Sequence, residues 1–239
     1  MALPSTAPAL AQALEDVRAR VRRAAERAKK NPNEIDILAV TKTLPPERVW
    51  EAWELGLWQF GESRVQEAER KKIALGDRFP ENRHPRWHLI GHLQSNKARK
   101  ALEIFDCVQS VDSLKLMELL DTEGGRRAQP VSCLVEIKIS EEPAKQGLPA
   151  ESLTAFLERA TRFPFVRIEG LMGVPPLFPD PEKTRPYFRH LKKLFDHHRA
   201  FFQNDAPILS MGMSADFEVA IEEGATLVRL GTALFGDRS

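Results

Sequence analysis

Eight short apolar or β-branched runs alternate with helical patterns along this chain of 239 residues. Strands that alternate with helices favour a parallel sheet, and eight such units favour an α/β fold closed into a (β/α)8 TIM barrel. An open, doubly wound sheet remains an alternative, because a strand count from sequence can be wrong by one or two. We place the strands near 35–41, 57–61, 86–91, 106–111, 131–139, 165–173, 207–212 and 226–230, and the helices near 46–56, 63–75, 95–103, 112–123, 150–162, 183–203 and 214–223.

An extra amphipathic helix precedes this alternation, over residues 8–30. Its apolar residues recur three and four positions apart, which places them on one helical face. No Gly-, Pro- or Ser-rich linker divides the chain, and helical periodicity resumes soon after the proline-rich stretch 175–181. We therefore expect one domain that covers residues 1–239. The apolar stripe consists of Leu10, Leu14, Val17, Val21, Ala24 and Ala28.

The charge balance argues against two classes of partner. The chain has 35 basic and 34 acidic side chains and a formal net charge of +1, so nothing in its overall charge favours nucleic acid or an anionic membrane. Cys107 and Cys133 lie inside apolar stretches, which indicates buried thiols in a reducing compartment. No apolar stretch is long enough to span a bilayer. We expect a cytoplasmic protein.

The histidines give no metal-binding pattern. His84, His88 and His92 have helical spacing, but Pro85 and the strand pattern around Trp87 argue against a helix there, so we expect no metal site. His197 and His198 fall on a charged helix face, where we expect both to be exposed.

Lys42 ends the apolar run Ile37–Thr41, and Pro45 and Pro46 follow it closely. In a TIM barrel the chemistry lies at the carboxyl ends of the strands. A lysine there can be desolvated, lose its proton and attack a carbonyl carbon to form an imine. On position alone, a lysine that extends its stem along the strand end towards water is the commoner explanation.

The last two strand ends resemble a phosphate site. The segments Ser210–Ser214 and Arg229–Thr232 each supply a glycine, a hydroxyl and the start of a helix, and this end of a TIM barrel often holds phosphate. Arg229 could add a bidentate contact to a phosphate or a ring. A lysine facing a phosphate site suggests a phosphorylated aldehyde, either pyridoxal 5′-phosphate (PLP) or the sugar phosphate of an aldolase.

Six segments, in order along the chain, now carry a specific resemblance. Together they resemble the pyridoxal phosphate homeostasis protein family, also called the proline synthetase co-transcribed homologue family, and the likeness runs from about residue 34 to residue 236. The segments are Ala39-Val40-Thr41-Lys42, Phe60-Gly61-Glu62, the block from Trp87 to Lys97, Gly170-Leu171-Met172, Ser210-Met211-Gly212-Met213-Ser214 and the block from Val228 to Gly236.

The resemblance implies a fold and a set of cofactor contacts. It implies a barrel similar to the N-terminal domain of alanine racemase, of the fold type III class of PLP proteins, with PLP held as a Schiff base on Lys42. Arg229 matches the arginine beside the phosphate and ring, and Met172 matches a residue that packs near the cofactor. Ser63 falls at a further contact position. The phosphate positions matched are Ser210, Gly212, Ser214, Gly231 and Thr232, and Met213 is expected as a further cofactor-binding residue.

Three residues depart from the family pattern. Ser63 and Arg64 replace a common Asn-Tyr pair, which puts a cofactor contact at Ser63 in doubt. Lys138 stands where the family usually has asparagine. It could provide a second amine or lower the pKa of Lys42 by like-charge repulsion. Pairing of Lys138 with Glu136 or Glu141 is the more ordinary expectation.

The resemblance implies control of free PLP and of amino-acid pools, an aspect of vitamin B6 homeostasis. A barrel-type racemase needs a second base, which related racemases draw from a tyrosine on an additional β-domain. This chain ends at Ser239 without such a domain, and its one tyrosine, Tyr187, lies in a helical region. We therefore expect a cofactor carrier without robust turnover rather than an enzyme.

Several alternatives and partners complete the expectation. A slow amino-acid racemase or a class I aldolase-like lyase acting on a sugar phosphate remain alternatives. A hydrolase using Glu62 and Glu136 is a weaker one, since glutamates near lysines more often form ion pairs. The expected partners are PLP, amino acids and recipient apo-enzymes, with no nucleic acid and no membrane. The expected oligomeric state is a monomer or a weak dimer.

Overall fold

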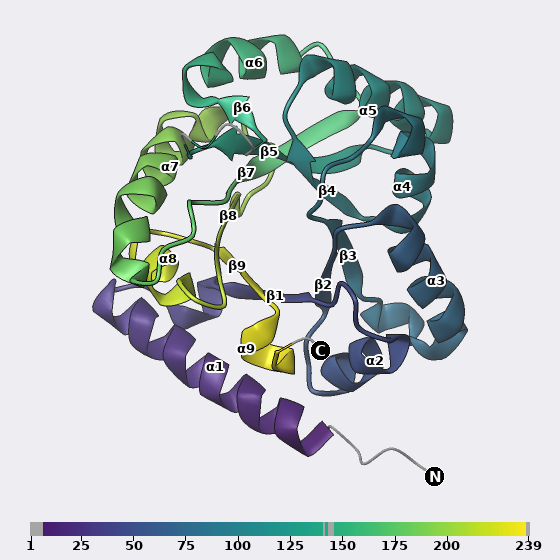
Figure 1. Ribbon diagram of the computed structural model, residues 1–239. Helices are drawn as coiled ribbons and strands as arrows, with labels where there is room; N and C mark the ends of the chain where they lie inside the picture. Colours follow the sequence, from purple (N-terminus) through teal and green to yellow (C-terminus); the bar gives the residue numbers. More distant parts are fainter. Residues whose placement is uncertain (1–6, 141, 143–145, 238–239) are drawn as a thin grey trace.

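A closed ring of eight parallel strands forms the centre of the molecule (Figure 1). The computed structural model describes residues 7–140, 142 and 146–237. Each strand pairs in parallel with the next, and β1 pairs with β9 to close the ring, so the predicted TIM barrel is confirmed and the open sheet is not formed. The eight strands are β1 Asp36–Val40, β2 Gln59–Glu62, β3 Arg86–Leu89, β4 Cys107–Val111, β5 Val131–Lys138, β7 Val166–Gly173, β8 Ile208–Met213 and β9 Leu227–Leu230.

The helices surround this ring, and α1 crosses the outside of the barrel beside α8 and α9 (Figure 1). Two predicted helices were too long: the helix expected over 183–203 ends at His197 and is followed by a 3-10 turn, Arg199–Phe201, and the helix expected over 8–30 ends at Arg27. The short strand β6, Leu148–Pro149, pairs with the end of β5 and was not predicted. The helices are α1 Ala7–Arg27, α2 Pro46–Glu54, α3 Val65–Leu75, α4 Ala98–Ile104, α5 Leu114–Arg127, α6 Leu153–Ala160, α7 Arg185–His197, α8 Phe217–Glu222 and α9 Thr232–Phe235.

Successive strand residues face opposite sides, so the barrel has two buried regions. Ala39 and Phe60 belong to the large core between the strands and the helices. Cys107, Leu134 and Met172 form a separate small cluster, which lies inside the barrel. The inside also holds buried polar side chains, and these determine the candidate site.

Two further expectations were tested by the fold. Cys107 and Cys133 are both buried and free, as predicted. The expectation for His198 was wrong: its side chain is buried, and its ring contacts the Thr154 hydroxyl at 2.9 Å and the Leu194 carbonyl at 2.8 Å. A helix face that is charged in sequence can therefore still carry one satisfied, buried histidine. Within the described residues, no helix is long and apolar enough to cross a membrane.

Candidate functional site

Lys42 lies just beyond the carboxyl end of β1 and is half-buried. The Thr41 amide before it extends the parallel ladder by donating to the Gly61 carbonyl at 3.1 Å. Thr43 after it has φ +68°, a left-handed conformation that is uncommon for a residue with a side chain. Continued along the chain, the alternation of β1 places Lys42 on the same side as Leu38, towards the barrel axis.

The loops that follow β8 and β9 meet at the same barrel mouth, next to Lys42, because β9 pairs directly with β1. Ser214 Oγ accepts hydrogen bonds from the Gly231 amide at 3.2 Å and the Ala233 amide at 3.1 Å. Gly212 has φ +89°, and a Cβ there would lie 2.5 Å from Cβ of Ala220, so only glycine fits. The structure therefore brings the two predicted phosphate segments together, with Thr232 exposed at the start of α9.

Arg229 is buried inside the barrel, where it joins β9 to the next two strands of the ring, β8 and β7. Its Nη1 donates to both the carbonyl and the hydroxyl oxygen of Ser210, each at 2.8 Å, and its Nη2 donates to the Gly173 carbonyl at 3.0 Å. Burial lowers the pKa of Arg229 to about 10, so the guanidinium remains charged at neutral pH. The arginine is thus a fixed cation beneath the mouth.

The Arg229 contacts continue into a relay of hydrogen bonds whose directions are all determined. Since arginine only donates, the Ser210 hydroxyl must give its one proton to Gln109 Oε1, at 2.7 Å. The Gln109 amide nitrogen then donates to His88 Nδ1, at 2.9 Å. His88 must therefore carry its proton on Nε2. This Nε2 is buried and has no partner among the described residues.

Burial also determines the protonation of the inward-facing groups. It lowers the pKa of His88 to about 3, with a further contribution from the charge of Arg86, so the ring is neutral. Burial raises the pKa of Glu136 to about 7, although the Arg229 charge acts in the opposite direction. Glu136 is paired in register with Met172, which in turn is paired with Ser210. This side of the barrel therefore holds a permanent cation and a carboxyl group that titrates near neutrality.

The remaining predicted residues occupy different depths. Ser63 directly follows β2, and the end of β3 packs on it so closely that a Cβ on Gly91 would lie 2.4 Å from the Ser63 carbonyl oxygen. Met172 is buried in the cluster inside the barrel. Lys138, the last residue of β5, is half-buried and forms no salt bridge with Glu136, while Glu141 lies outside the described residues.

The Ser210 hydroxyl is engaged with Arg229 and Gln109, so in this structure it supports the arginine, and its contact with a phosphate stays a prediction. Gln109 and His88 were not singled out as site residues. The signal that could have found them is the occurrence of polar side chains in the middle of buried strands, at positions that face the barrel axis. Met213 is half-buried beside Ser214, and its amide donates to Asp216 Oδ1 at 2.7 Å.

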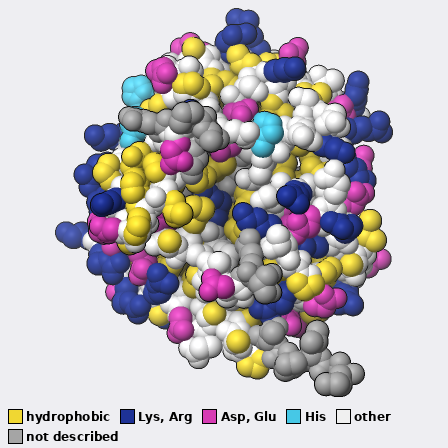
Figure 2. Space-filling view, viewed as in Figure 1, with side chains coloured by type: hydrophobic (Ala, Val, Ile, Leu, Met, Phe, Trp, Pro, Cys, Tyr) yellow, Lys and Arg dark blue, Asp and Glu magenta, His cyan; other side chains and the backbone are white. Residues whose placement is uncertain are grey.

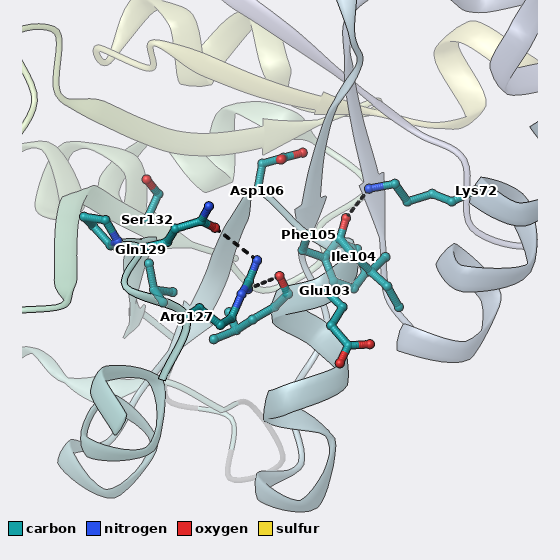
Figure 3. Close-up of a pocket in the computed structure, with 11 residues that line it drawn as sticks. Lys72, Glu103, Ile104, Phe105, Asp106, Arg127, Gln129 and Ser132 are labelled. Carbon is teal, nitrogen blue, oxygen red and sulfur yellow. Dashed lines mark hydrogen bonds between the residues drawn. The ribbon is translucent and has the colours of Figure 1, made fainter. Parts of the chain in front are cut away.

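A small pocket at the other end of the barrel is a separate feature. It has a volume of about 210 Å³ and lies where β4 and β5 begin (Figure 3). Lys72 and Arg127 line it, but they hold the end of α4: Lys72 Nζ donates to the Ile104 carbonyl at 2.8 Å, and Arg127 donates to the Leu102 carbonyl. None of the predicted site residues lines this pocket.

Figure 2 shows the face of the barrel seen in Figure 1, which is hollowed near its centre, with Lys and Arg side chains beside the hollow. Among the described residues, no group of three or more His, Cys, Asp or Glu side chains is placed to hold a metal ion. One barrel mouth therefore brings together a half-buried lysine, two joined hydroxyl- and glycine-containing loops, and a fixed arginine.

Comparison with known proteins gives the same picture at the level of the whole chain. The family described as "Alanine racemase, N-terminal domain" matches residues 13–239. A pyridoxal phosphate homeostasis protein of Aquifex aeolicus is 40% identical over 225 residues, which cover 94% of this chain and 96% of that relative.

Two solved structures extend the comparison. PipY of Synechococcus elongatus, solved with PLP bound, superposes with a TM-score of 0.81 at 35% identity and covers 95% of this chain and 100% of its own. Alanine racemase of Corynebacterium glutamicum superposes with a TM-score of 0.68 at 14% identity, covering 94% of this chain and 61% of its own. The second likeness concerns the fold alone.

Proposed function

Since this chain belongs to the pyridoxal phosphate homeostasis protein family, we propose that it binds PLP at the barrel mouth and holds it covalently on Lys42. The observation that carries the proposal is the juxtaposition of the loops after β8 and β9, joined through Ser214, beside the end of β1 that leads into Lys42. When bound, PLP supplies a reactive aldehyde that an amine can capture.

The residues present fit such a ligand. Ser214, Gly231 and Thr232 would hold the phosphate, since a hydroxyl and the amides at the start of a helix suit an anion. Gly212 keeps β8 close to α8, because a Cβ there would meet Ala220 at 2.5 Å. In its neutral form the Lys42 amine would form the C=N bond to the aldehyde, whose oxygen would leave as water with the two amine protons. Ser63 and Met172 would border the ring.

We assign the protein the task of holding and handing over PLP, without robust turnover. Arg229 supports this role: even with a pKa of about 10 it keeps its proton at neutral pH, so it can donate hydrogen bonds to a ring but not protonate it. An unprotonated ring withdraws electrons less strongly from a bound amino acid. Tyr187, the one tyrosine of the sequence, packs against Phe178 with ring centroids 5.9 Å apart.

The proposal includes the setting in which this exchange occurs. Amino acids would displace the lysine from the bound aldehyde, and apo-enzymes would receive the cofactor. Two free, buried cysteines suit a reducing cytoplasm. We propose that the whole chain acts as one binding domain, as a monomer or weak dimer. An aldolase-like reaction on a sugar phosphate is the second candidate, because a lysine beside a phosphate site serves both.

An absorbance spectrum from about 300 to about 500 nm, recorded with added PLP, tests the assignment of Lys42. We expect a band at about 420 nm in the wild type that is lost in Lys42→Ala. Lys138→Ala is the matched variant, and it loses the band only if Lys138 captures the aldehyde. Reduction with borohydride and mass spectrometry would identify the modified lysine directly. A wild type without the band would refute the proposal and favour the aldolase-like candidate.

A further inference from the structure

Behind the turn that presents Lys42 lies a buried lysine, Lys71 of α3. Its side chain is only 4% exposed. Its Nζ donates to the Thr41 carbonyl at 2.6 Å, to Glu62 Oε1 at 2.6 Å and to Glu67 Oε1 at 2.8 Å. A lysine ammonium has three donors, so all three protons of Lys71 have partners. The sequence favours an ion pair of Glu62 with a lysine over a role as a catalytic carboxylate of a hydrolase, and Glu62 forms such a pair with Lys71.

The same group holds the backbone on both sides of Lys42. On one side, the Thr41 carbonyl accepts from Lys71 and the Thr41 hydroxyl donates to Glu62 Oε1 at 2.6 Å. On the other side, the Thr43 amide donates to Glu67. Thr43 has φ +68°, and such a conformation persists in a residue with a side chain only where its surroundings enforce it. The contacts of Lys71, Glu62 and Glu67 provide that enforcement.

The electrostatics of this group depend on the Lys71 cation. Burial raises the pKa of Glu62 even though the charge and hydrogen bond of Lys71 lower it. Burial also acts to raise the pKa of Glu67, but hydrogen bonds from Lys71 and from the Thr43 amide outweigh it, and the pKa is lowered. Glu62 Oε2 is buried with no partner among the described residues. Without Lys71, two carboxyl groups would remain beside the turn with no cation bonded to both.

We propose that Lys71 is a positioning residue, which with Glu62 and Glu67 fixes the backbone at 41–43 and so directs the Lys42 amine at its aldehyde. The inference rests on the proposed function of Lys42. The direction of a side chain follows from the backbone angles at its own residue, and covalent capture needs the amine at a defined approach to the carbonyl carbon. The proposed phosphate contacts come from the loops after β8 and β9, so binding of the phosphate does not need this turn.

Two ligands separate the contribution of covalent capture from that of phosphate binding. Pyridoxine 5′-phosphate has the ring and phosphate of PLP but an alcohol in place of the aldehyde, so it cannot form the C=N bond. We expect Lys71→Met to raise the dissociation constant of PLP by at least about tenfold. The dissociation constant of pyridoxine 5′-phosphate should stay within about twofold of the wild-type value. The band at about 420 nm should weaken in parallel with the loss of PLP affinity.

Lys72→Met is the matched control. Lys72 is the next residue of the same helix, is half-buried, and bonds to the Ile104 carbonyl away from the turn, so its loss should leave both dissociation constants unchanged. If Lys71→Met does not fold, the double variant Lys71→Met/Glu62→Gln removes the unpaired buried charge at position 62 and leaves an acceptor for the Thr41 hydroxyl. The same selective loss of PLP affinity is expected for it.

Each outcome is decisive. If Lys71→Met weakens the binding of both ligands equally, Lys71 serves overall stability. If the affinity for PLP is unchanged, the turn holds its shape without Lys71. Either result overturns the inference while the proposed function stands. A wild type that binds the two phosphates equally and shows no band would refute the proposed function itself, and the inference with it.

Discussion

The buried, neutral His88 should contribute a loss of stability in mild acid. In the folded state burial lowers the pKa of His88 to about 3, whereas the unfolded chain has the ordinary value of 6.5. Between these two values the unfolded state binds more protons, so stability falls as the pH falls. Each pKa unit corresponds to about 1.4 kcal/mol. From about pH 8 to about pH 5, His88 alone should remove about 2 kcal/mol from the free energy of unfolding.

Glu136 acts in the opposite direction and must be separated from His88. Its folded pKa of about 7 lies above its ordinary 4.5, so the folded state takes up a proton first and gains stability as the pH falls between these values. The gain is of similar size, about 2 kcal/mol, before allowance for the partial exposure of Glu136. The pH profile of the wild type alone can therefore be nearly flat, and only a comparison isolates the histidine.

The comparison uses His88→Asn, whose carboxamide oxygen can still accept from Gln109 but does not titrate. Urea unfolding followed by tryptophan fluorescence gives the free energy of unfolding of both proteins from about pH 8 to about pH 5. The stability advantage of the wild type over the variant should shrink by about 2 kcal/mol across this range. A difference that stays constant within about 0.5 kcal/mol would refute the assignment of His88 as a neutral side chain in the folded protein.

Two further substitutions test the phosphate end. Gly212→Ala should lower the free energy of unfolding by about 2–4 kcal/mol. The reason is that it combines a left-handed backbone at φ +89° with a Cβ placed 2.5 Å from Cβ of Ala220. A thermal shift corresponding to less than about 1 kcal/mol would contradict this. Ser214→Ala removes the acceptor for the Gly231 and Ala233 amides. It should weaken PLP and pyridoxine 5′-phosphate alike in binding titrations, in contrast to Lys71→Met, and a selective effect on PLP would argue against a phosphate role for Ser214.

Much of the architecture followed from local patterns. Each of the eight predicted apolar runs overlaps one barrel strand, and the ends of these runs correctly placed Lys42 and the two loops at the mouth. Strand and helix periods are properties of neighbouring residues, so they can be read along the chain. The errors occurred where local pattern is weak: the end of α7 at His197, the two-residue strand β6, and the burial of His198.

The hydrogen bonds between polar side chains inside the barrel depend on closure of the sheet into a ring. The relay runs from Arg229 through Ser210 and Gln109 to His88. Ser210 and Gln109 are 101 positions apart in sequence, and Arg229 and Ser210 are 19 positions apart. None of these contacts has a local signal, because they form only when β3, β4, β8 and β9 are brought around one axis. The same closure directed the Ser210 hydroxyl to Arg229, although its motif suggested a phosphate contact.

The sequence by itself determined the fold class, the family and the lysine at the end of β1, since all three depend on residue types in a fixed order. Only the tertiary structure decided what holds that lysine. Lys71 lies 30 positions after Thr41, in a helix whose charged residues look solvent-exposed in sequence, yet it is buried with all three of its protons engaged. A buried cation is stable only with partners that satisfy every donor, and those partners come together only when α3 packs against the barrel.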